Sequence, residues 1–305
     1  MSTKDNNNIR LFLGTEIARR LVNIKFEEVT EIRLRVDKPL IIKTKHGEYS
    51  IDEKGKFSKS HLENYAPTIE DIRETIERIS QYSFYAFESE LQLGYITLPG
   101  GHRVGVVGQA VVENGVVQTW KYISGLNIRV AHSALGCAND VLPHILGSFG
   151  FLHTMIISPP GFGKTTLLRD IVRQISNYGL TVGLVDERSE VAGCFQGVAQ
   201  NDVGFRTDVL DGCPKALAMV MLLRGMSPDV IAVDELGGEQ DARAVDTVLN
   251  AGVKLLCTAH GNNVEDAMAN PSLSQMLSRG IFERFIVLSK PYITSVFDGG
   301  GIHVN

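Results

Sequence analysis

Short runs in which apolar and polar residues alternate fill the first part of the chain. Ile32, Leu34 and Val36 stand two positions apart. Because successive side chains of a strand point to opposite faces, this spacing predicts a half-buried strand. A second strand is expected over residues 40–44, and three more over residues 94–122, where glycine-rich turns separate the apolar runs.

Two helices are expected beside these strands. Residues 9–24 have the pattern of a short helix. In the second helix, isoleucines recur at spacings of three and four from Ile69 to Ile79, which gives one apolar stripe facing a core. Thr68 and Asp71 at its start fit a capping box. The first part of the chain is therefore predicted to be a small α+β domain, assigned to residues 1–135.

From residue 151 onward, predicted strands and helices alternate regularly. Apolar runs predict strands at 153–157, 181–185, 230–233, 253–258 and 284–288. This alternation is typical of a parallel sheet that is covered by helices on both faces. Ligands of such sheets bind at the carboxyl ends of the strands. We assign residues 136–305 to this α/β domain.

Composition supports a globular chain and narrows its partners. The 305 residues favour two domains over one, and 44% of them are hydrophobic. The net charge of −5 argues against broad contact with a nucleic-acid backbone. The four cysteines are far apart in the sequence, which favours reduced thiols in a cytosolic protein over zinc ligands or disulfides. The apolar run at 216–223 is too short to span a bilayer.

A glycine-rich segment joins the first strand of the second domain to a helix. Gly161 and Gly163 allow backbone N–H groups to face phosphate oxygens, Lys164 reaches the β- and γ-phosphates, and the Thr165 hydroxyl binds Mg²⁺. Ser158 replaces the first glycine of the usual P-loop pattern. We therefore expect a RecA-like P-loop ATPase domain that binds ATP and Mg²⁺. The binding segment consists of Ser158, Pro159, Pro160, Gly161, Phe162, Gly163, Lys164, Thr165 and Thr166.

Carboxylates follow two other predicted strands. Asp234 and Glu235 come directly after an apolar run; Asp234 is expected to bind Mg²⁺, and Glu235 to orient or deprotonate the attacking water. Asp186, Glu187 and Glu190 follow the strand before it and offer a second set of acids near the γ-phosphate. The general base therefore stays open between Glu235 and this second cluster, with Glu235 preferred.

Hydrogen-bond donors and cations are expected to complete the site. His260 ends the strand after Asp234 and Glu235, and there it can sense the γ-phosphate. A ring ATPase commonly completes each site with an arginine from a neighbouring subunit, because the transition state spreads negative charge over the phosphoryl oxygens. The arginines considered for this role are Arg103, Arg129, Arg206 and Arg224.

The order of these segments resembles the secretion ATPases of type II and type IV systems, including pilus motors. Those proteins carry a phosphate loop, an acidic Asp box, a Walker B strand and a His box. More narrowly, the chain is similar to the stage III sporulation protein AA family. This resemblance covers most of the chain and rests on the segments 158–170, 185–190, 205–215, 233–237, 98–105 and 123–129.

The resemblance implies an assembly and a place in the cell. It implies a ring, taken as a homohexamer, that lies in the cytoplasm at the inner face of a membrane, under integral membrane subunits of a secretion-like channel. In an endospore former this channel joins mother cell and forespore, and the ATPase is expected on the mother-cell side. The resemblance also favours Arg103 and Arg129, because arginines of the N-terminal domain or linker reach the nucleotide in the relatives. Many secretion ATPases have glycine where this chain has Asp234.

Two other functions fit parts of the pattern. The chain is compatible with a nucleic-acid-associated ATPase, such as a relative of helicase loaders or recombinases, and with a nucleotide-gated scaffold that hardly turns over. The acidic balance and the order of the Asp and His boxes favour a motor at a membrane complex, with no nucleic-acid partner and no membrane span of its own.

Overall fold

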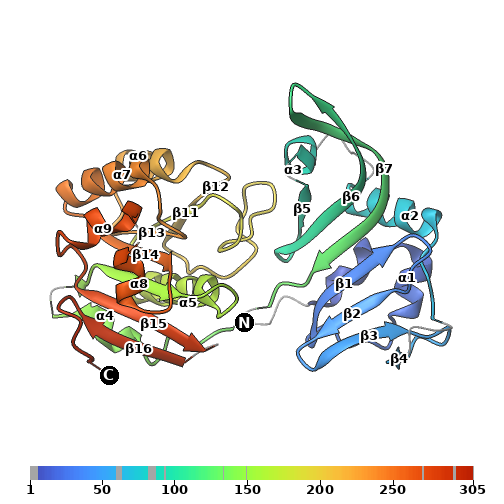
Figure 1. The fold of residues 1–305 in the computed structure, drawn as a ribbon, viewed down its shortest axis with the longest axis horizontal. Helices are drawn as coiled ribbons and strands as arrows, with labels where there is room; N and C mark the ends of the chain where they lie inside the picture. Colours follow the sequence, from blue (N-terminus) through green and yellow to red (C-terminus); the bar gives the residue numbers. More distant parts are fainter. Residues whose placement is uncertain are drawn as a thin grey trace. The chain divides into compact units, whose positions relative to one another are not determined.

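The computed structural model of the chain describes residues 6–59, 64–81, 87–92, 94–132, 134–148, 150–269, 271–290 and 293–304. The chain divides into two compact units, Met1–His132 and Ser133–Asn305, which are drawn in Figure 1. Each unit has a seven-stranded sheet of its own. The mixed α/β class with a mainly parallel sheet in the second unit confirms the predicted fold class.

An antiparallel sheet organises the first unit. Its strand order is β4-β3-β2-β1-β7-β6-β5, and each neighbouring pair is antiparallel. The three strands predicted over residues 94–122 are β5 and the long β6–β7 hairpin. The strands are β1 Val29–Arg35, β2 Ile41–Thr44, β3 Gly47–Ile51, β4 Phe57–Ser58, β5 Tyr95–Leu98, β6 His102–Glu113 and β7 Val116–Arg129.

Helices of the first unit supply the apolar side chains that the sheet buries. They are the 3₁₀ helix η1 Asn6–Phe12 and the helices α1 Thr15–Arg20, α2 Ile69–Ile79 and α3 Glu88–Gln92. The predicted single helix over 9–24 is wrong, because the helical conformation is interrupted at Gly14, between η1 and α1. There the Gly14 N–H donates to Thr75 Oγ1 of α2 at 2.9 Å, a tertiary contact that apolar spacing does not reveal.

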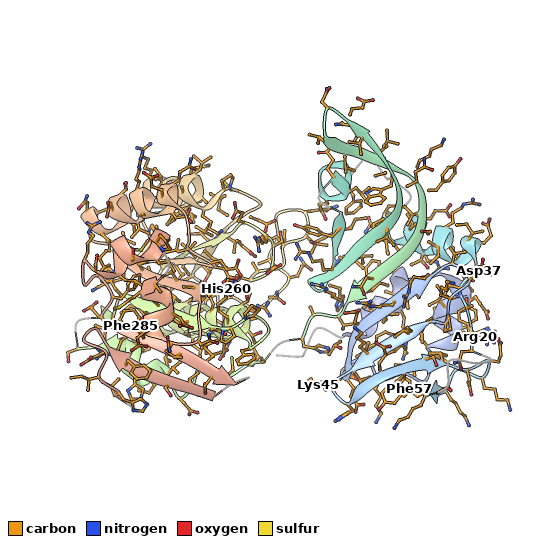
Figure 2. The ribbon with its side chains drawn as sticks, in the orientation of Figure 1. Arg20, Asp37, Lys45, Phe57, His260 and Phe285 are labelled. Carbon is orange, nitrogen blue, oxygen red and sulfur yellow. The ribbon has the colours of Figure 1, made fainter. Side chains whose placement is uncertain are left out.

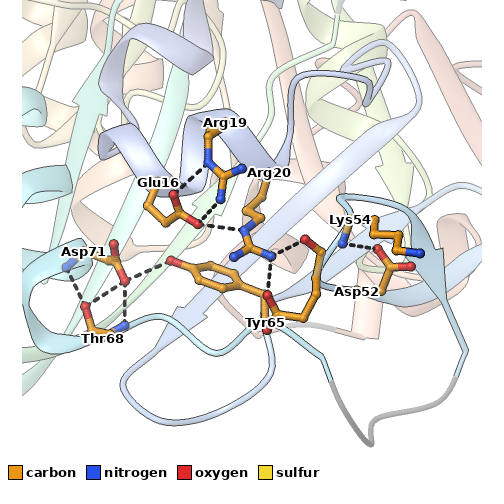
Figure 3. Close-up of polar contacts among 9 residues, drawn as sticks. Glu16, Arg19, Arg20, Asp52, Lys54, Tyr65, Thr68 and Asp71 are labelled. Carbon is orange, nitrogen blue, oxygen red and sulfur yellow. Dashed lines mark hydrogen bonds and ion pairs between the residues drawn. The ribbon is translucent and has the colours of Figure 1, made fainter.

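The start of α2 is held by the predicted capping box. Thr68 Oγ1 accepts from the Asp71 N–H at 3.2 Å, and Asp71 Oδ2 accepts from the Thr68 N–H at 2.7 Å. Figure 3 shows that the Tyr65 hydroxyl also donates to Asp71. The Arg20 guanidinium lies 4.7 Å from the centre of the Tyr65 ring and donates to Glu16. These contacts tie α1 to α2.

The sheet of the second unit is parallel apart from one edge strand. Its order is β12-β11-β13-β14-β10-β15-β16, and only the β15–β16 pair is antiparallel. The five predicted strands are present, and β12 and β16 extend the two edges beyond them. The strands are β10 Thr154–Ser158, β11 Val182–Asp186, β12 Thr207–Asp211, β13 Val230–Val233, β14 Lys254–His260, β15 Arg284–Lys290 and β16 Ile293–Asp298.

Helices cover both faces of this sheet, as the alternating pattern predicted. One apolar core joins the sheet to α6, α7, α8 and α9, and a second core joins the opposite face to α4 and α5. A two-stranded hairpin, β8 Leu146–Gly147 with β9 Gly150–Phe151, precedes β10. The helices are α4 Leu142–Ile145, α5 Lys164–Tyr178, α6 Lys215–Met226, α7 Glu239–Asn250, α8 Val264–Ala269 and α9 Pro271–Leu277.

The strand order brings distant segments together at one edge. β14 lies between β10 and β13, and Ser158 at the end of β10 is in register with His260 at the end of β14. Figure 2 labels His260 there, with Phe285 of β15 farther along the sheet. In the part of the chain that the structure describes, no helix has the length and apolar character needed to cross a bilayer.

Candidate functional site

The glycine-rich segment forms the turn between β10 and α5. Ser158 is the buried last residue of β10, and it has none of the positive φ that would require glycine at this position. Gly161 and Gly163 do have positive φ values, 80° and 94°, a backbone conformation that favours glycine. Gly163 precedes α5 and has no side chain to cap it, so the first N–H groups of the helix are available to an anion.

Lys164, Glu235 and His260 meet at the carboxyl edge of the sheet. The Lys164 ammonium is almost fully buried and donates to Glu235 Oε1 at 3.1 Å. His260 Nε2 lies 2.8 Å from the same oxygen and 3.4 Å from Lys164 Nζ. Lys164 and His260, which are far apart in the sequence, therefore meet at one oxygen of Glu235. The structure brings these three sequence-predicted residues together.

Thr165, Asp234 and Thr258 form a second group beside the first. The Thr165 hydroxyl donates to Asp234 Oδ2 at 2.9 Å, and the Thr258 hydroxyl donates to Asp234 Oδ1 at 2.6 Å. Thr258 Oγ1 also accepts from the Glu235 N–H at 2.8 Å. A hydroxyl and a carboxylate are the hard oxygen ligands that Mg²⁺ prefers, with phosphates and water completing its shell. The donor set at Thr165 and Asp234 therefore fits the expected Mg²⁺.

The environment of Glu235 keeps its carboxyl group ionised. Burial alone would raise its pKa, but the Lys164 ammonium and His260 beside it outweigh burial and hold the pKa below its usual value. Its backbone is left-handed, with φ at 56°, which is uncommon for a residue other than glycine. In this conformation the Glu235 N–H donates to Thr258 Oγ1, which helps to hold the backbone there.

The Asp186 carboxylate is committed to the backbone of the loop that follows β11. It is 1% exposed and accepts from the N–H groups of Glu190, Val191 and Ala192 at 2.8–3.2 Å. Burial raises its pKa, against the effect of these amides. Arg169 of α5 donates to the carbonyls of Glu190 and Val191 at 2.7 and 2.6 Å. Asp186 and Arg169 together fix this loop from two sides.

The remaining charged residues of the loop point to different partners. Glu187 pairs with Lys215 at 2.9 Å. Arg188 Nη1 donates to Glu235 Oε2 at 3.2 Å, so both oxygens of Glu235 are engaged. A shallow hollow beside these groups is lined by five carboxylates and two cations, namely Asp186, Glu187, Glu190, Asp234, Glu235, Arg188 and Lys215.

Arg103 and Arg129 lie in the first unit, outside the unit that carries the glycine-rich turn between β10 and α5. They are cross-strand partners on β6 and β7. The Arg103 guanidinium stacks 3.6 Å from the centre of the Tyr95 ring. Arg129 is exposed and is also a register partner of Glu31 on β1. The two arginines therefore share one face of the antiparallel sheet.

Sequence reasoning missed three residues that shape this site. Arg188 stands within the acidic cluster, and its place in the sequence does not indicate that it pairs with Glu235. Thr258 lies two residues before His260, and its hydroxyl in an otherwise apolar strand was the available signal. Arg169 falls on the second turn of α5, where its contact with the loop depends on tertiary structure alone.

Comparison with known proteins identifies relatives along nearly the whole chain. The family model described as "Sporulation stage III, protein AA" matches residues 3–302. Stage III sporulation protein AA of Bacillus subtilis (strain 168) is 40% identical over 285 residues, which cover 90% of this chain and 88% of that protein.

Solved structures with a similar fold are far more distant in sequence. The ATPase DotB of Legionella pneumophila has a TM-score of 0.55 at 15% identity, over 85% of this chain and 71% of its own. The pilus retraction motor PilT, solved with bound ADP, has a TM-score of 0.53 at 18% identity, over 89% of this chain and 76% of its own. At these identities the likeness concerns the fold.

Proposed function

We propose that this chain, which belongs to the sporulation stage III, protein AA family, is a Mg²⁺-dependent ATPase. In this proposal it works as the motor of a membrane-associated, secretion-like channel complex in endospore formation. The observation that carries the proposal is the convergence of Lys164, Asp234 and Glu235 at one edge of the parallel sheet. A cation behind a glycine-rich turn, with carboxylates at the same sheet edge, is an arrangement found in enzymes that transfer phosphoryl groups.

The side chains at this edge divide the work. Lys164 and the first amides of α5 would hold the β- and γ-phosphates. Thr165 and Asp234 would hold Mg²⁺, and Thr258 fixes the orientation of Asp234 through its hydroxyl. When bound, Mg²⁺ supplies positive charge that offsets the charge on the phosphate oxygens.

Glu235 is the group that we assign as the general base. The oxygen of a water molecule attacks the γ-phosphorus, the bond from that phosphorus to the β–γ bridging oxygen breaks, and ADP leaves with the electron pair. Glu235 accepts the proton of the water. Once phosphates draw Lys164 away, the Glu235 carboxylate loses a neighbouring cation and becomes more basic. Asp186 fits this role less well, because its oxygens already accept three backbone N–H groups.

The assembly proposed for the chain follows the resemblance to secretion ATPases. It is a ring, a homohexamer, in which Arg129 and Arg103 would reach the nucleotide of a neighbouring subunit, while His260 and Glu190 line the same site from within. Its other partners would be integral membrane subunits of a sporulation channel. The proposed location is the cytoplasm, at the inner face of the membrane on the mother-cell side.

An ATPase assay on the full chain with Mg²⁺ tests this proposal. The wild-type protein should bind ATP and release phosphate, and Lys164→Ala should abolish binding or hydrolysis, because it removes the buried ammonium that is proposed to bind the β- and γ-phosphates. Arg243→Ala, which removes an exposed cation of α7 in the same unit, is the matched control. A wild-type chain that ignores nucleotides at ring-forming concentration would refute the proposal. Hydrolysis that depends on DNA would favour the nucleic-acid-associated class instead.

A further inference from the structure

We propose that Arg188 is a positioning residue that controls Glu235 from within the same subunit. Without a triphosphate it holds Glu235, and with a triphosphate it turns to the terminal phosphate and releases Glu235 to accept a proton from water. This inference rests on the proposed ATPase function.

The loop that carries Arg188 is anchored on both sides of this residue. Asp186 before it binds three backbone N–H groups after it, and Arg169 clamps the carbonyls of Glu190 and Val191. Ser189 donates to Asp211 Oδ1 at 2.6 Å. The backbone position of Arg188 is therefore fixed, so a change of partner requires only its side chain to turn.

The side chain of Arg188 is largely exposed. It is 62% exposed, whereas that of Lys164 is 6% exposed. An exposed ion pair contributes little to stability, so the contact of Arg188 with Glu235 is not needed to hold the fold. An exposed arginine whose position is set by an anchored loop can exchange one anionic partner for another at low cost.

Both oxygens of Glu235 are engaged by cations or donors. Lys164 and His260 lie at Oε1, and Arg188 donates to Oε2 at 3.2 Å. A carboxylate that is held on both oxygens is poorly placed to take a proton from water. A terminal phosphate carries more negative charge than one carboxylate and matches the planar guanidinium with two hydrogen bonds. We therefore expect Lys164 and Arg188 to bind the triphosphate in place of Glu235.

A binding experiment on the full-length chain separates this role from a structural one. We would measure the dissociation constants of ADP and of a non-hydrolysable ATP analogue, each with Mg²⁺, for the wild type and for Arg188→Ala. ADP affinity should stay within about twofold, while the preference for the ATP analogue should fall by about tenfold, the loss expected for one charge-assisted contact. Arg188→Lys should restore part of the preference, and Arg243→Ala, which removes another exposed arginine of the same unit, should leave it unchanged.

A double-mutant cycle tests the exchange of partners. Glu235→Gln removes the competitor for Arg188 and should tighten binding of the ATP analogue, and adding Arg188→Ala should cancel much of that gain, so that the two effects are not additive. An unchanged ATP-to-ADP preference in Arg188→Ala, or additive effects in the cycle, would overturn this inference and leave the proposed function standing. A wild-type chain that binds neither nucleotide would instead overturn the proposed function itself.

Discussion

The Thr258 hydroxyl orients Asp234, the carboxylate proposed to bind Mg²⁺. Replacing this hydroxyl with a methyl group tests whether the Mg²⁺ site depends on it. Thr258→Val keeps the shape of the side chain but removes the donor to Asp234 at 2.6 Å and the acceptor for the Glu235 N–H at 2.8 Å. Thr258 is fully buried, so water cannot easily replace the hydroxyl. Thr258→Ser is the matched control, because it keeps the hydroxyl and loses only the methyl group.

The two lost hydrogen bonds set the size of the effect. A bond to a charged acceptor contributes about 1.5–3 kcal/mol, and a buried N–H left without an acceptor costs about 1–3 kcal/mol. The added methyl group returns about 0.8 kcal/mol through burial. We therefore expect Thr258→Val to lower the free energy of unfolding by about 3 kcal/mol, against about 1 kcal/mol for the methyl group lost in Thr258→Ser.

Urea denaturation and a Mg²⁺ titration measure the two consequences. Far-UV circular dichroism is the suitable signal for urea unfolding. Tryptophan fluorescence would report on the other unit, because the chain's one tryptophan, Trp120, lies on β7. The Mg²⁺ concentration for half-maximal ATP hydrolysis should rise about tenfold in Thr258→Val, since groups that orient a metal ligand affect metal affinity on this scale. If the valine and serine variants unfold at the same urea concentration and need the same Mg²⁺, the assigned role of Thr258 is wrong.

Three further variants test separate parts of the structure. Glu235→Gln should still bind ATP but hydrolyse it about 10²–10⁴-fold more slowly, the usual contribution of a general base, and normal phosphate release would move the base to the Asp186 loop. Arg129→Ala should retain ATP binding and lose most turnover, whereas weaker binding with normal turnover per bound ATP would contradict a role in the transition state. Burial would raise the pKa of Asp170, but the Ala138 N–H and Arg173 hold it below its usual value. A carboxyl group whose pKa is lower in the folded state stabilises the fold at pH values above its unfolded pKa, and this stabilisation is lost as the pH falls. Asp170→Asn should therefore lower the free energy of unfolding, measured by urea titration, by about 2 kcal/mol at pH 7 and by less below about pH 4. A difference between the two proteins that does not change with pH would refute this.

The sequence was informative where local pattern and tertiary structure coincide. The five apolar runs after residue 151 became buried strands because a parallel sheet covered on both faces leaves little room for polar residues. The glycine-rich turn between β10 and α5 was predictable, because glycine readily adopts the positive φ that Gly161 and Gly163 have. The isoleucine stripe of α2 was largely correct, with Ile72 and Ile79 buried, although Ile69 at the helix start is 46% exposed.

The rest required contacts between distant residues. Nothing in the order of Asp186, Glu187 and Glu190 indicates that one carboxylate would bind the loop backbone and another a lysine. The partner of Arg188 is 47 positions away, and the helix predicted over 9–24 breaks where Gly14 meets α2. β12 was missed because its side chains are only half-buried at the sheet edge, so its residues lack a continuous apolar run.

The ordinary strand conformation of Ser158 has a consequence for how such proteins are found. Since this position lies within β10 and its backbone suits any small L-residue, the architecture does not demand glycine there. Database patterns that insist on glycine at the start of the motif would pass over chains of this kind, whereas a pattern built on the two glycines with left-handed backbone and the lysine that follows them would retrieve them.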